Sequence, residues 1–409
     1  MKTLFKRFSA VFLAVIMIAA LAACGQADTP AAVETDAPVE SSESSSDDLT
    51  VNVMVLNGTT GFGMANLMYS AQNGEAALDY NFSVETDASS VTAALINGSA
   101  DIAALPTNAA AALYNKTGGT VQVVALNTRG VLYLVADSSL EISSFEDLRG
   151  KTVYAPAQNP TFIFRYLCEA NGLTPGEDIV IDNSYAQPAD LNTAVSSGAV
   201  QLAVLPEPMV TIARSANDKL TAALDLTAEW DKVAPAGSLV QGCAVVRREF
   251  AEAHPAELAC FLNEYKASVE ALTADVQGSA EKIQETGIFA KAAVAAKAIP
   301  NCNICFIDGA DMQSALAAFY EVMYSVAPDS IGGSIPGDDF YCVLGLSLSV
   351  QSQSGRCSQR CSGSRSGSCS PRLSAVRCCS RLPWLSSGGF LSLWVRRSSC
   401  APCCSRCSG

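Results

Sequence analysis

One carboxylate stands out by its setting in the sequence. Glu207 lies between Pro206 and Pro208, and because each proline fixes its own backbone φ, the chain around the carboxylate is stiff. A carboxylate presented in this way at the rim of a binding site can accept hydrogen bonds from an amine, an amidine or an aminopyrimidine. The alternative is an exposed loop carboxylate that binds nothing.

Other residues suited to holding a small molecule gather in turns between apolar segments. They are Thr59, Thr60, Gly61, Phe62, Thr107, Asn108, Gln158, Asn159, Thr161 and Tyr185. Glycine lets backbone amides approach a ligand, and the helix after such a turn offers its positive N-terminus. Phe62 and Tyr185 could stack on a heteroaromatic ring. The alternatives are a turn that only connects two elements and a Thr107 or Asn108 that only caps its helix.

Two arginines could instead bind a sulfonate or a carboxylate. Arg129 falls in a turn and Arg165 within a helix whose outer side we expect to be solvated, so we expect both to be structural. The residue types therefore favour a neutral or cationic heteroaromatic ligand over an anion.

The sequence offers no set of catalytic residues. Its single histidine, His254, precedes Pro255 at a predicted helix start, and the spacings of a phosphate-binding loop or of a zinc protease are absent. Cys302 and Cys305 form one Cys-x-x-Cys pair, without the second pair that a zinc site requires. The pair could form a disulfide or act as a redox pair. We expect no enzyme activity, no cofactor and no metal.

Alternating strands and helices would position these turns. An apolar strand over 49–56 precedes a glycine-rich turn and a helix over 64–74, which is a βα unit. A strand over 81–87 leads to a helix over 88–98 with Ser89 or Ser90 as its N-cap and Gly98 as its stop. Beyond about residue 250 the composition predicts helices without further strands.

A near-repeat supports two similar halves. ALINGSADIAALP begins at Ala94 and AVSSGAVQLAVLP at Ala194, so that Gly98 corresponds to Gly198 and Pro106 to Pro206. In each copy a helix stopped by glycine leads into a buried strand that ends in proline at the carboxyl edge of a sheet, where open α/β sheets place their ligands. We predict one lobe from 49–136 plus 245–341 and a second from 137–244, with crossings near 132–136 and 242–246.

The first residues have the features of an export signal. Basic residues precede an uncharged apolar run over 8–23, which ends in Leu-Ala-Ala-Cys. We interpret 1–23 as a signal peptide rather than a spanning helix, and Cys24 as the site of lipid attachment, with a plain signal peptide as the alternative. Residues 24–48 lack aromatic residues and are rich in Ser, Pro and acidic residues, as a disordered tether would be.

The last residues differ from the rest of the chain. Residues 342–409 hold ten of the 16 cysteines and nine arginines but no Asp, Glu, Lys or His, and we interpret them as a shifted, disordered reading frame. A nucleic-acid arm, a metal-binding tail and a disulfide knot are the alternatives. Without this tail the chain carries 40 acidic and 17 basic residues, which argues against nucleic acid as a partner.

Several segments together resemble the solute-binding lipoproteins of bacterial ABC importers. They are the Leu-Ala-Ala-Cys motif, LNGTTGFGMANLM, INGSADIAALPTNAA, FEDLRGKTVYAPAQNPTFIFRYLCEANGL, LPEPMVTIA, GCAVVRREFAEAHPAEL and SIGGSIPGDDFY. The similarity runs from about residue 49 to 341 and is greatest to the branch that contains nitrate-, taurine- and sulfonate-binding proteins and thiamine-pyrimidine binders.

This resemblance implies a two-lobed α/β fold of the periplasmic-binding-protein type, class II, which captures a small-molecule solute between its lobes. It also implies delivery to a membrane permease and its ATPase, a lipid anchor at Cys24 on the outer face of the membrane, and a monomer. A secreted enzyme on the same fold, similar to a pyrimidine synthase, and a surface adhesin are the alternatives.

Overall fold

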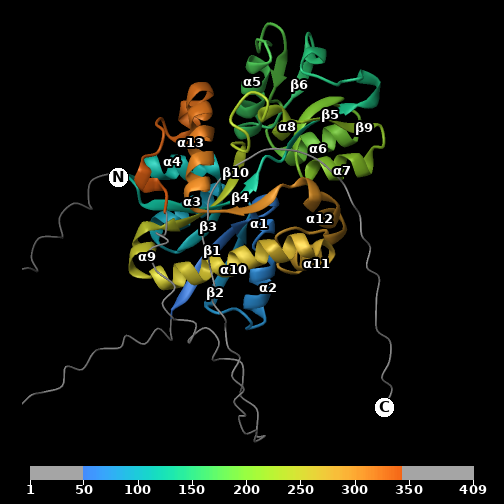
Figure 1. Ribbon diagram of the computed structural model, residues 1–409. Helices are drawn as coiled ribbons and strands as arrows, with labels where there is room; N and C mark the ends of the chain where they lie inside the picture. Colours follow the sequence, from blue (N-terminus) through green and yellow to red (C-terminus); the bar gives the residue numbers. More distant parts are fainter. Residues whose placement is uncertain (1–48, 343–409) are drawn as a thin grey trace, which may run out of the picture. The chain divides into compact units, whose positions relative to one another are not determined.

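The computed structural model describes residues 49–342, and these build two β-sheets with helices on their faces (Figure 1). The predicted signal peptide, the lipid-attachment residue Cys24, the tether and the tail from residue 343 lie outside the described residues. None of the helices within 49–342 combines the length and apolarity needed to span a bilayer.

The first sheet has six strands in the order β11-β4-β10-β3-β1-β2. Their bounds are β1 Thr50–Leu56, β2 Asp79–Glu85, β3 Ile102–Pro106, β4 Val121–Arg129, β10 Val240–Arg247 and β11 Ile304–Ile307. Strands β1, β2 and β3 are parallel, whereas β10 runs antiparallel to both β3 and β4. We call this sheet and its helices lobe I.

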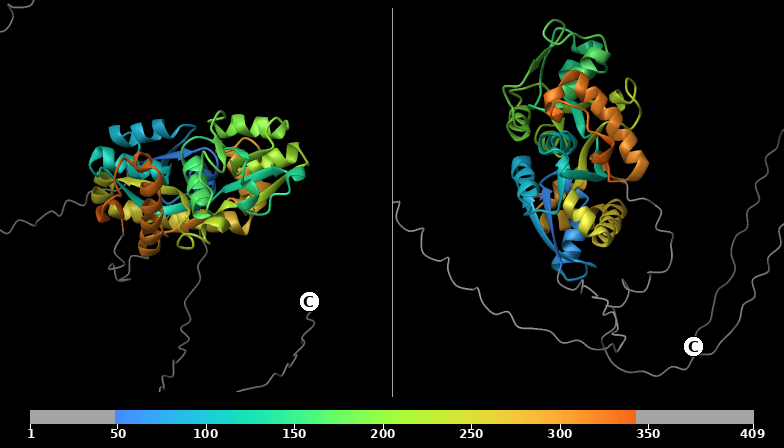
Figure 2. Two further views of the ribbon diagram at one scale, coloured as in Figure 1. Left: turned by 90° about the horizontal axis from the view of Figure 1, so that it is seen from above. Right: turned by 90° about the vertical axis from the view of Figure 1, so that its left-hand side faces the viewer.

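The second sheet has five strands in the order β7-β6-β8-β5-β9. Their bounds are β5 Leu132–Asp137, β6 Thr152–Tyr154, β7 Val180–Asp182, β8 Leu202–Pro206 and β9 Leu220–Asp225. Strands β6, β7 and β8 are parallel, and β5 runs antiparallel to β8 and β9. We call this sheet and its helices lobe II, which is drawn in green in Figure 2.

Helices cover both faces of each sheet. Those of lobe I are α1 Thr59–Phe62, α2 Ala65–Gln72, α3 Ala88–Asn97, α4 Thr107–Thr117, α9 Arg248–Ala253, α10 Pro255–Ala274, α11 Val276–Glu285, α12 Ala292–Ala298 and α13 Gly309–Val326. Those of lobe II are α5 Asn159–Ala170, α6 Pro188–Ser196, α7 Met209–Ala216 and α8 Leu226–Trp230. Short 3₁₀ turns lie at Ser138–Leu140, Glu146–Leu148, Ile299–Asn301, Pro328–Ile331 and Asp338–Phe340.

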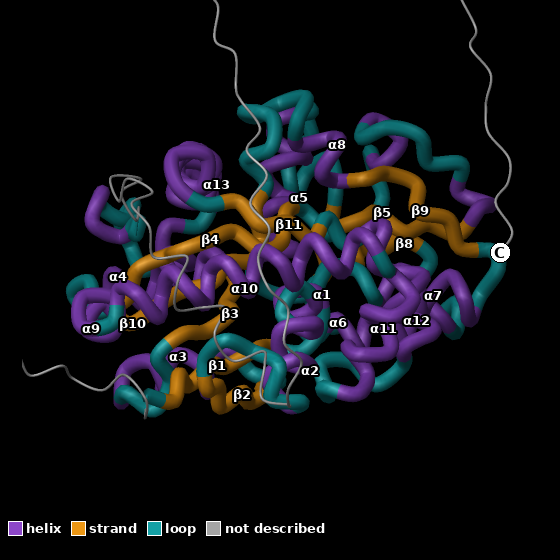
Figure 3. Tube along the Cα trace, turned by 60° about the horizontal axis from the view of Figure 1, so that its bottom comes forward, coloured by secondary structure: helices purple, strands orange, loops and turns teal. Residues whose placement is uncertain are grey.

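Three apolar cores fill the spaces between sheets and helices. Helices α2, α9, α10, α11 and α12 contribute apolar side chains to a core on one face of the first sheet, and Figure 3 shows α10 running across that sheet. Helices α6 and α7 cover one face of the second sheet. A third core runs from the other face of the first sheet, under α3, α4 and α13, into the second sheet under α5 and α8.

The shared core joins the lobes through aromatic rings. Trp230 of α8 is fully buried, its centroid lies 6.0 Å from that of Phe319 in α13, and its indole N–H donates to the hydroxyl of Ser238 at 2.8 Å. Tyr166 of α5 packs on the same indole at 4.9 Å. Because separating these rings would expose buried apolar surface to water, this contact stabilises the association of the two lobes.

The predicted near-repeat adopts the same structure in both lobes. Gly98 and Gly198 both have left-handed backbone, with φ of 80° and 77°, and strands β3 and β8 that follow them share one burial pattern. The left-handed region is accessible to glycine without a steric penalty, so these glycines mark where α3 and α6 give way to the next strand. The repeated pattern in the sequence is therefore structural.

The chain crosses between the sheets twice, at 130–131 and at the segment before β10. Gly130 and Val131 separate β4 from β5, and Val240 begins β10. These crossings lie a few residues before the predicted boundaries after residues 136 and 244, because β5 pairs in the second sheet and β10 in the first. The apolar pattern runs through both crossings, so it gives no sign of the change of sheet.

Two local predictions are corrected by the structure. Asp87, not Ser89 or Ser90, caps α3, and its carboxylate accepts from the Ser89 amide at 2.8 Å. The segment after residue 250 is not purely helical, because β11 pairs with β4 at the edge of the first sheet. The four residues of β11 are only half-buried. A strand this short shows too little alternation of apolar and polar residues to be recognised in the sequence.

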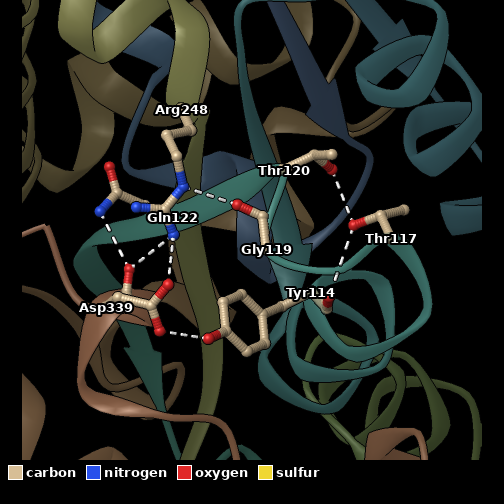
Figure 4. Close-up of polar contacts among 7 residues, drawn as sticks. All are labelled: Tyr114, Thr117, Gly119, Thr120, Gln122, Arg248 and Asp339. Carbon is tan, nitrogen blue, oxygen red and sulfur yellow. Dashed lines mark hydrogen bonds and ion pairs between the residues drawn. The ribbon is translucent and has the colours of Figure 1, made fainter.

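A clamp of polar contacts fixes the last described residues to lobe I (Figure 4). We call it the Asp339 clamp, and its side chains are those of Tyr114, Gln122, Arg248 and Asp339. Arg248 donates to both the backbone oxygen and the carboxylate of Asp339, each at 2.9 Å, Gln122 donates to that backbone oxygen at 3.0 Å, and the Tyr114 hydroxyl donates to the carboxylate. The clamp places the chain so that Cys342 donates from its amide to Val123 of β4 at 2.9 Å.

Candidate ligand-binding site

A hydrogen bond between two predicted site residues joins the two lobes. Each of these residues lies just beyond the carboxyl end of a strand. Asn108 comes two residues after β3, and Asn159 follows β6 after a short turn. The Nδ2 group of Asn159 donates to Oδ1 of Asn108 at 2.8 Å. The carboxyl ends of β3 and β6 therefore face each other across the junction between the lobes.

Asn159 has more hydrogen-bonding capacity than its protein neighbours use. Its side chain is only 8% exposed, and its Oδ1 atom has no hydrogen-bond partner within the part of the chain that the structure describes. An unpaired buried acceptor costs free energy, on the order of 1–3 kcal/mol. A ligand or a water that donates to this oxygen would recover that cost.

The same junction brings together the N-termini of two helices. Asn108 lies in the first turn of α4 and Asn159 is the first residue of α5, and neither helix has a side chain bonded to its N-terminal amides. The first amides of a helix lack partners inside the helix and carry partial positive charge. Two uncapped N-termini that meet in this way can bind an anionic group.

Helix α1 adds hydroxyl groups at the end of β1. Thr59 and Thr60 are half-buried, and neither hydroxyl has a protein partner among residues 49–342. Gly61 lies so close to the strand that a Cβ there would come within 2.3 Å of the Leu56 oxygen. The glycine is thus required for α1 to pack on β1, and the two threonines before it stay available.

Three predicted site residues have structural partners instead. Phe62 is fully buried, and its ring packs on Phe289 at 6.0 Å in the core of lobe I. Thr107 is buried and donates to the Val240 oxygen at 2.8 Å. The hydroxyl of Thr161 donates to the Pro156 oxygen at 2.7 Å. These contacts hold the turns in place and leave no free group for a ligand.

Two further predicted residues lie at the edge of the second sheet. Tyr185 is half-buried and packs edge-on against Tyr154, with centroids 5.9 Å apart. Gln158 is exposed and has a φ of 70°, which is uncommon for a residue other than glycine and is found often at functional sites. Both therefore stay candidates for contact with a solute.

Glu207 is buried and already bonded. Its side chain is 3% exposed, and its carboxylate accepts from the Thr211 amide at 3.1 Å and from the Thr211 hydroxyl at 3.0 Å. Burial raises the pKa of this carboxyl, while the bonds from Thr211 and the charge of Arg214 oppose the rise. The carboxylate thus caps α7.

Two polar residues near the end of β4 in lobe I were not predicted to have free groups. Asn127, near the end of β4, is 1% exposed and its Nδ2 has no protein partner within the described residues. The neighbouring Thr128 hydroxyl donates to Asn127 at 2.9 Å and contacts the Thr59 oxygen at 3.5 Å. An asparagine inside an otherwise apolar strand is the signal that could have found this position, because a buried amide needs partners.

The two arginines considered as anion ligands have no acidic partner. Arg129 at the end of β4 is exposed, Arg165 in α5 is half-buried, and neither forms an ion pair with another described residue. Among residues 49–342, no three His, Cys, Asp or Glu side chains come together as metal ligands would. The free groups identified at the junction are the helix amides and the Asn159 oxygen.

Comparison with known proteins identifies the family of this chain. Residues 74–281 match the family model described as "ABC transporter, phosphonate, periplasmic substrate-binding protein". No curated protein sequence matches the chain.

Solved structures show the same fold. The structure of an ABC transporter protein from Parabacteroides distasonis is 24% identical, covers 72% of this chain and 99% of its own, and gives a TM-score of 0.61. The periplasmic aliphatic sulphonate-binding protein SsuA from Escherichia coli is 14% identical, covers 71% and 97%, and gives 0.57. The ligand-binding component of an ABC-type import system from Staphylococcus aureus, solved with zinc bound, is 16% identical, covers 72% and 97%, and gives 0.54.

The chain belongs to the phosphonate family of periplasmic substrate-binding proteins of ABC transporters. Its two sheets and their helices have the periplasmic-binding-protein fold, as predicted. It is the extracytoplasmic solute-binding subunit of an ABC importer, a class of protein that delivers small solutes to a permease complex. The predictions of family, fold and function are confirmed.

Proposed function

We propose that this subunit captures an organic solute with an oxyanion head, such as a phosphonate or a sulfonate, at the junction of α4 and α5. The observation that carries the proposal is the hydrogen bond from Asn159 to Asn108, which brings two uncapped helix N-termini together. The hydroxyls of Thr59 and Thr60 would complete the site from α1. The phosphonate family to which the chain belongs and its similarity to the aliphatic sulphonate-binding protein SsuA point to the same chemistry.

Neutral donors are sufficient for such a head group. Backbone amides at a helix N-terminus can bind an oxyanion without a cation, and each helix adds a favourable interaction of about 0.3–1 kcal/mol with a nearby negative charge. A donor on the solute, such as a hydroxyl or a protonated oxyanion, would satisfy the unpaired Oδ1 of Asn159.

A heteroaromatic solute is the second candidate, in line with the prediction from residue types. The observation in its favour is the edge-on pair of Tyr154 and Tyr185 at the edge of the second sheet, against which a flat ring could pack. Glu207 would then be its polar partner. The two Thr211 donors that already bond this buried carboxylate weigh against that role.

A thermal-shift screen of the purified full chain separates these candidates. A ligand that binds only the folded state raises the melting temperature, by an amount that corresponds to about 2.7 kcal/mol when its concentration is 100 times Kd. We expect a shift with methylphosphonate or ethanesulfonate and none with an aminopyrimidine. A shift with the aminopyrimidine alone would replace the oxyanion proposal by the heteroaromatic one.

We further propose that residues 1–23 are a signal peptide and that Cys24 carries the lipid that holds a monomer at the membrane, next to its permease and ATPase. The order of basic, apolar and small residues before Cys24 supports this, and a diacyl anchor would hold the protein firmly. We also propose that the subunit catalyses no reaction. Labelling with a radioactive fatty acid should mark the wild-type chain, and label retained by Cys24→Ser would refute the anchor.

A further inference from the structure

The turn before α5 has a counterpart in lobe I. Gly58 precedes α1 and Gln158 precedes α5. Their backbone oxygens accept bonds from the first turns of these helices, from the Gly61 amide at 3.0 Å and from the Phe162 amide at 3.1 Å. Gly58 has φ 85° and ψ −157°, and Gln158 has φ 70° and ψ −136°. The two turns therefore have similar shapes, although one is built on glycine and the other on glutamine.

This backbone conformation suits glycine but strains glutamine. Positive φ combined with an extended ψ is occupied almost only by glycine, because a Cβ is crowded there by its own backbone. A Cβ at Gly58 would have no heavy atom of another residue within 4 Å, so the cost of a side chain in such a turn comes from the backbone itself. Glycine at position 158 would therefore relieve strain in lobe II and keep the turn.

The surrounding structure holds the strained turn in place. The Ala157 amide donates to the Ala186 oxygen at 3.0 Å. On the other side, the Thr161 hydroxyl donates to the Pro156 oxygen at 2.7 Å. Strained residues persist only where their surroundings determine the backbone in this way, and they are frequent at ligand sites.

The side chain of Gln158 is free. It is exposed, and its amide has no polar partner within residues 49–342. The next residue, Asn159, has a buried and unpaired Oδ1 atom that needs a partner from outside the described protein. Pro160 then supplies no backbone amide, so α5 has one donor fewer at its N-terminus. The side-chain amide of Gln158 could replace that donor.

We propose that Gln158 is a specificity-determining residue of the solute site, whose side-chain amide donates to the oxyanion held at the junction of α4 and α5. This role rests on the proposed function, which places the solute next to Asn159. It accounts for a glutamine where lobe I has Gly58, since no contact of the Gln158 side chain within the described protein offsets the strain.

Two variants of the full chain separate the backbone of Gln158 from its side chain. Gln158→Ala removes the amide and keeps the strained backbone, whereas Gln158→Gly removes both. Without ligand, the melting temperature should be unchanged in the first and a few degrees higher in the second. Calorimetric titration with methylphosphonate should give about threefold to tenfold weaker binding in both, as expected for the loss of one hydrogen bond.

Two further positions sharpen the test. Gln158→Glu keeps the length of the side chain, but its carboxylate cannot donate and repels an oxyanion, so it should bind methylphosphonate more weakly than Gln158→Ala. Gln187 is the matched control, because it is an exposed residue before α6 with an ordinary φ of −95° and no polar partner among the described residues. Gln187→Ala should keep the wild-type Kd, and Gln187→Gly should not raise the melting temperature.

An unchanged Kd in Gln158→Ala would overturn the proposal, and so would wild-type affinity in Gln158→Glu. A melting temperature of Gln158→Gly below that of wild type would show that glutamine is not strained in this turn, which also overturns it. If wild type binds an aminopyrimidine and no methylphosphonate, the proposed solute class fails. Weaker aminopyrimidine binding by Gln158→Ala would then still support a solute contact at Gln158, and equal binding would refute it.

Discussion

The Asp339 clamp and the Asn108–Asn159 junction both tie together segments far apart in the sequence, but they differ in how completely their polar groups are paired. In the clamp, Asp339 accepts hydrogen bonds from Arg248, Gln122 and Tyr114, and its carboxylate pairs with the Arg248 guanidinium. At the junction one neutral bond forms, and an oxygen of Asn159 stays unpaired and buried. The clamp therefore has little hydrogen-bonding capacity left, whereas the junction keeps a buried acceptor, which is why we propose it as the ligand site.

Among changes in and next to the Asp339 clamp, Phe340→Ala should lower the stability of the fold most. The ring is fully buried, with the rings of Tyr114 and Tyr320 at 4.9 Å and 6.2 Å. Its loss should lower the free energy of unfolding by about 3–5 kcal/mol, measured by urea denaturation. Tyr324→Ala in α13, where the side chain is exposed, is the control. Similar losses of stability in both variants would show that burial of the Phe340 ring contributes nothing particular to the fold.

At the junction, Asn108→Asp should weaken the binding of an oxyanion without lowering the stability of the fold. The aspartate still accepts from Nδ2 of Asn159, and its charge near the α4 N-terminus should stabilise the helix by about 0.3–1 kcal/mol. The same charge repels an oxyanion, so we expect the Kd for methylphosphonate to rise several-fold while the melting temperature does not fall. Unchanged affinity in calorimetry would place the head group away from α4.

Arg248→Ala should have the smallest effect. The Asp339 carboxylate is 62% exposed, and ion pairs in contact with water contribute about 1 kcal/mol or less. We expect a slight fall in the urea midpoint and no change in methylphosphonate affinity. A loss as large as that of Phe340→Ala would mean that the ion pair, not the ring, holds this segment.

Acid should weaken the clamp before it weakens the junction. The Tyr114 bond, with help from Arg248, lowers the pKa of Asp339. A lowered carboxyl pKa means that the stabilisation is present above the ordinary value and is lost as pH falls through the lowered one. Asp339→Asn should therefore flatten the dependence of the urea midpoint on pH below about 4, and an unchanged dependence would contradict this.

Local sequence signals predicted much of the fold. The near-repeat ending at Pro106 and Pro206 placed two buried strands and their helices correctly, because glycine stops and apolar runs act over short distances. Strand β11 was missed because its pairing with β4 depends on residues nearly 180 positions away. The crossings were misplaced for the same reason, since only pairing shows to which sheet a strand belongs.

Candidate site residues were harder to predict. The sequence identified Asn108 and Asn159 as polar turn residues, but their direct bond depends on how the lobes meet. Phe62 appeared free to stack on a ligand, yet packing placed it in the core. A turn sequence indicates which groups are polar, and only tertiary contacts determine which of them are already paired.

The most direct test of the proposed site is calorimetric titration of methylphosphonate into wild type and Asn159→Ala. Removal of the amide breaks the bond to Asn108 and removes the buried oxygen, so we predict at least about tenfold weaker binding, equivalent to about 1.4 kcal/mol, with little change in the melting temperature. Equal affinities in the two proteins would contradict the account.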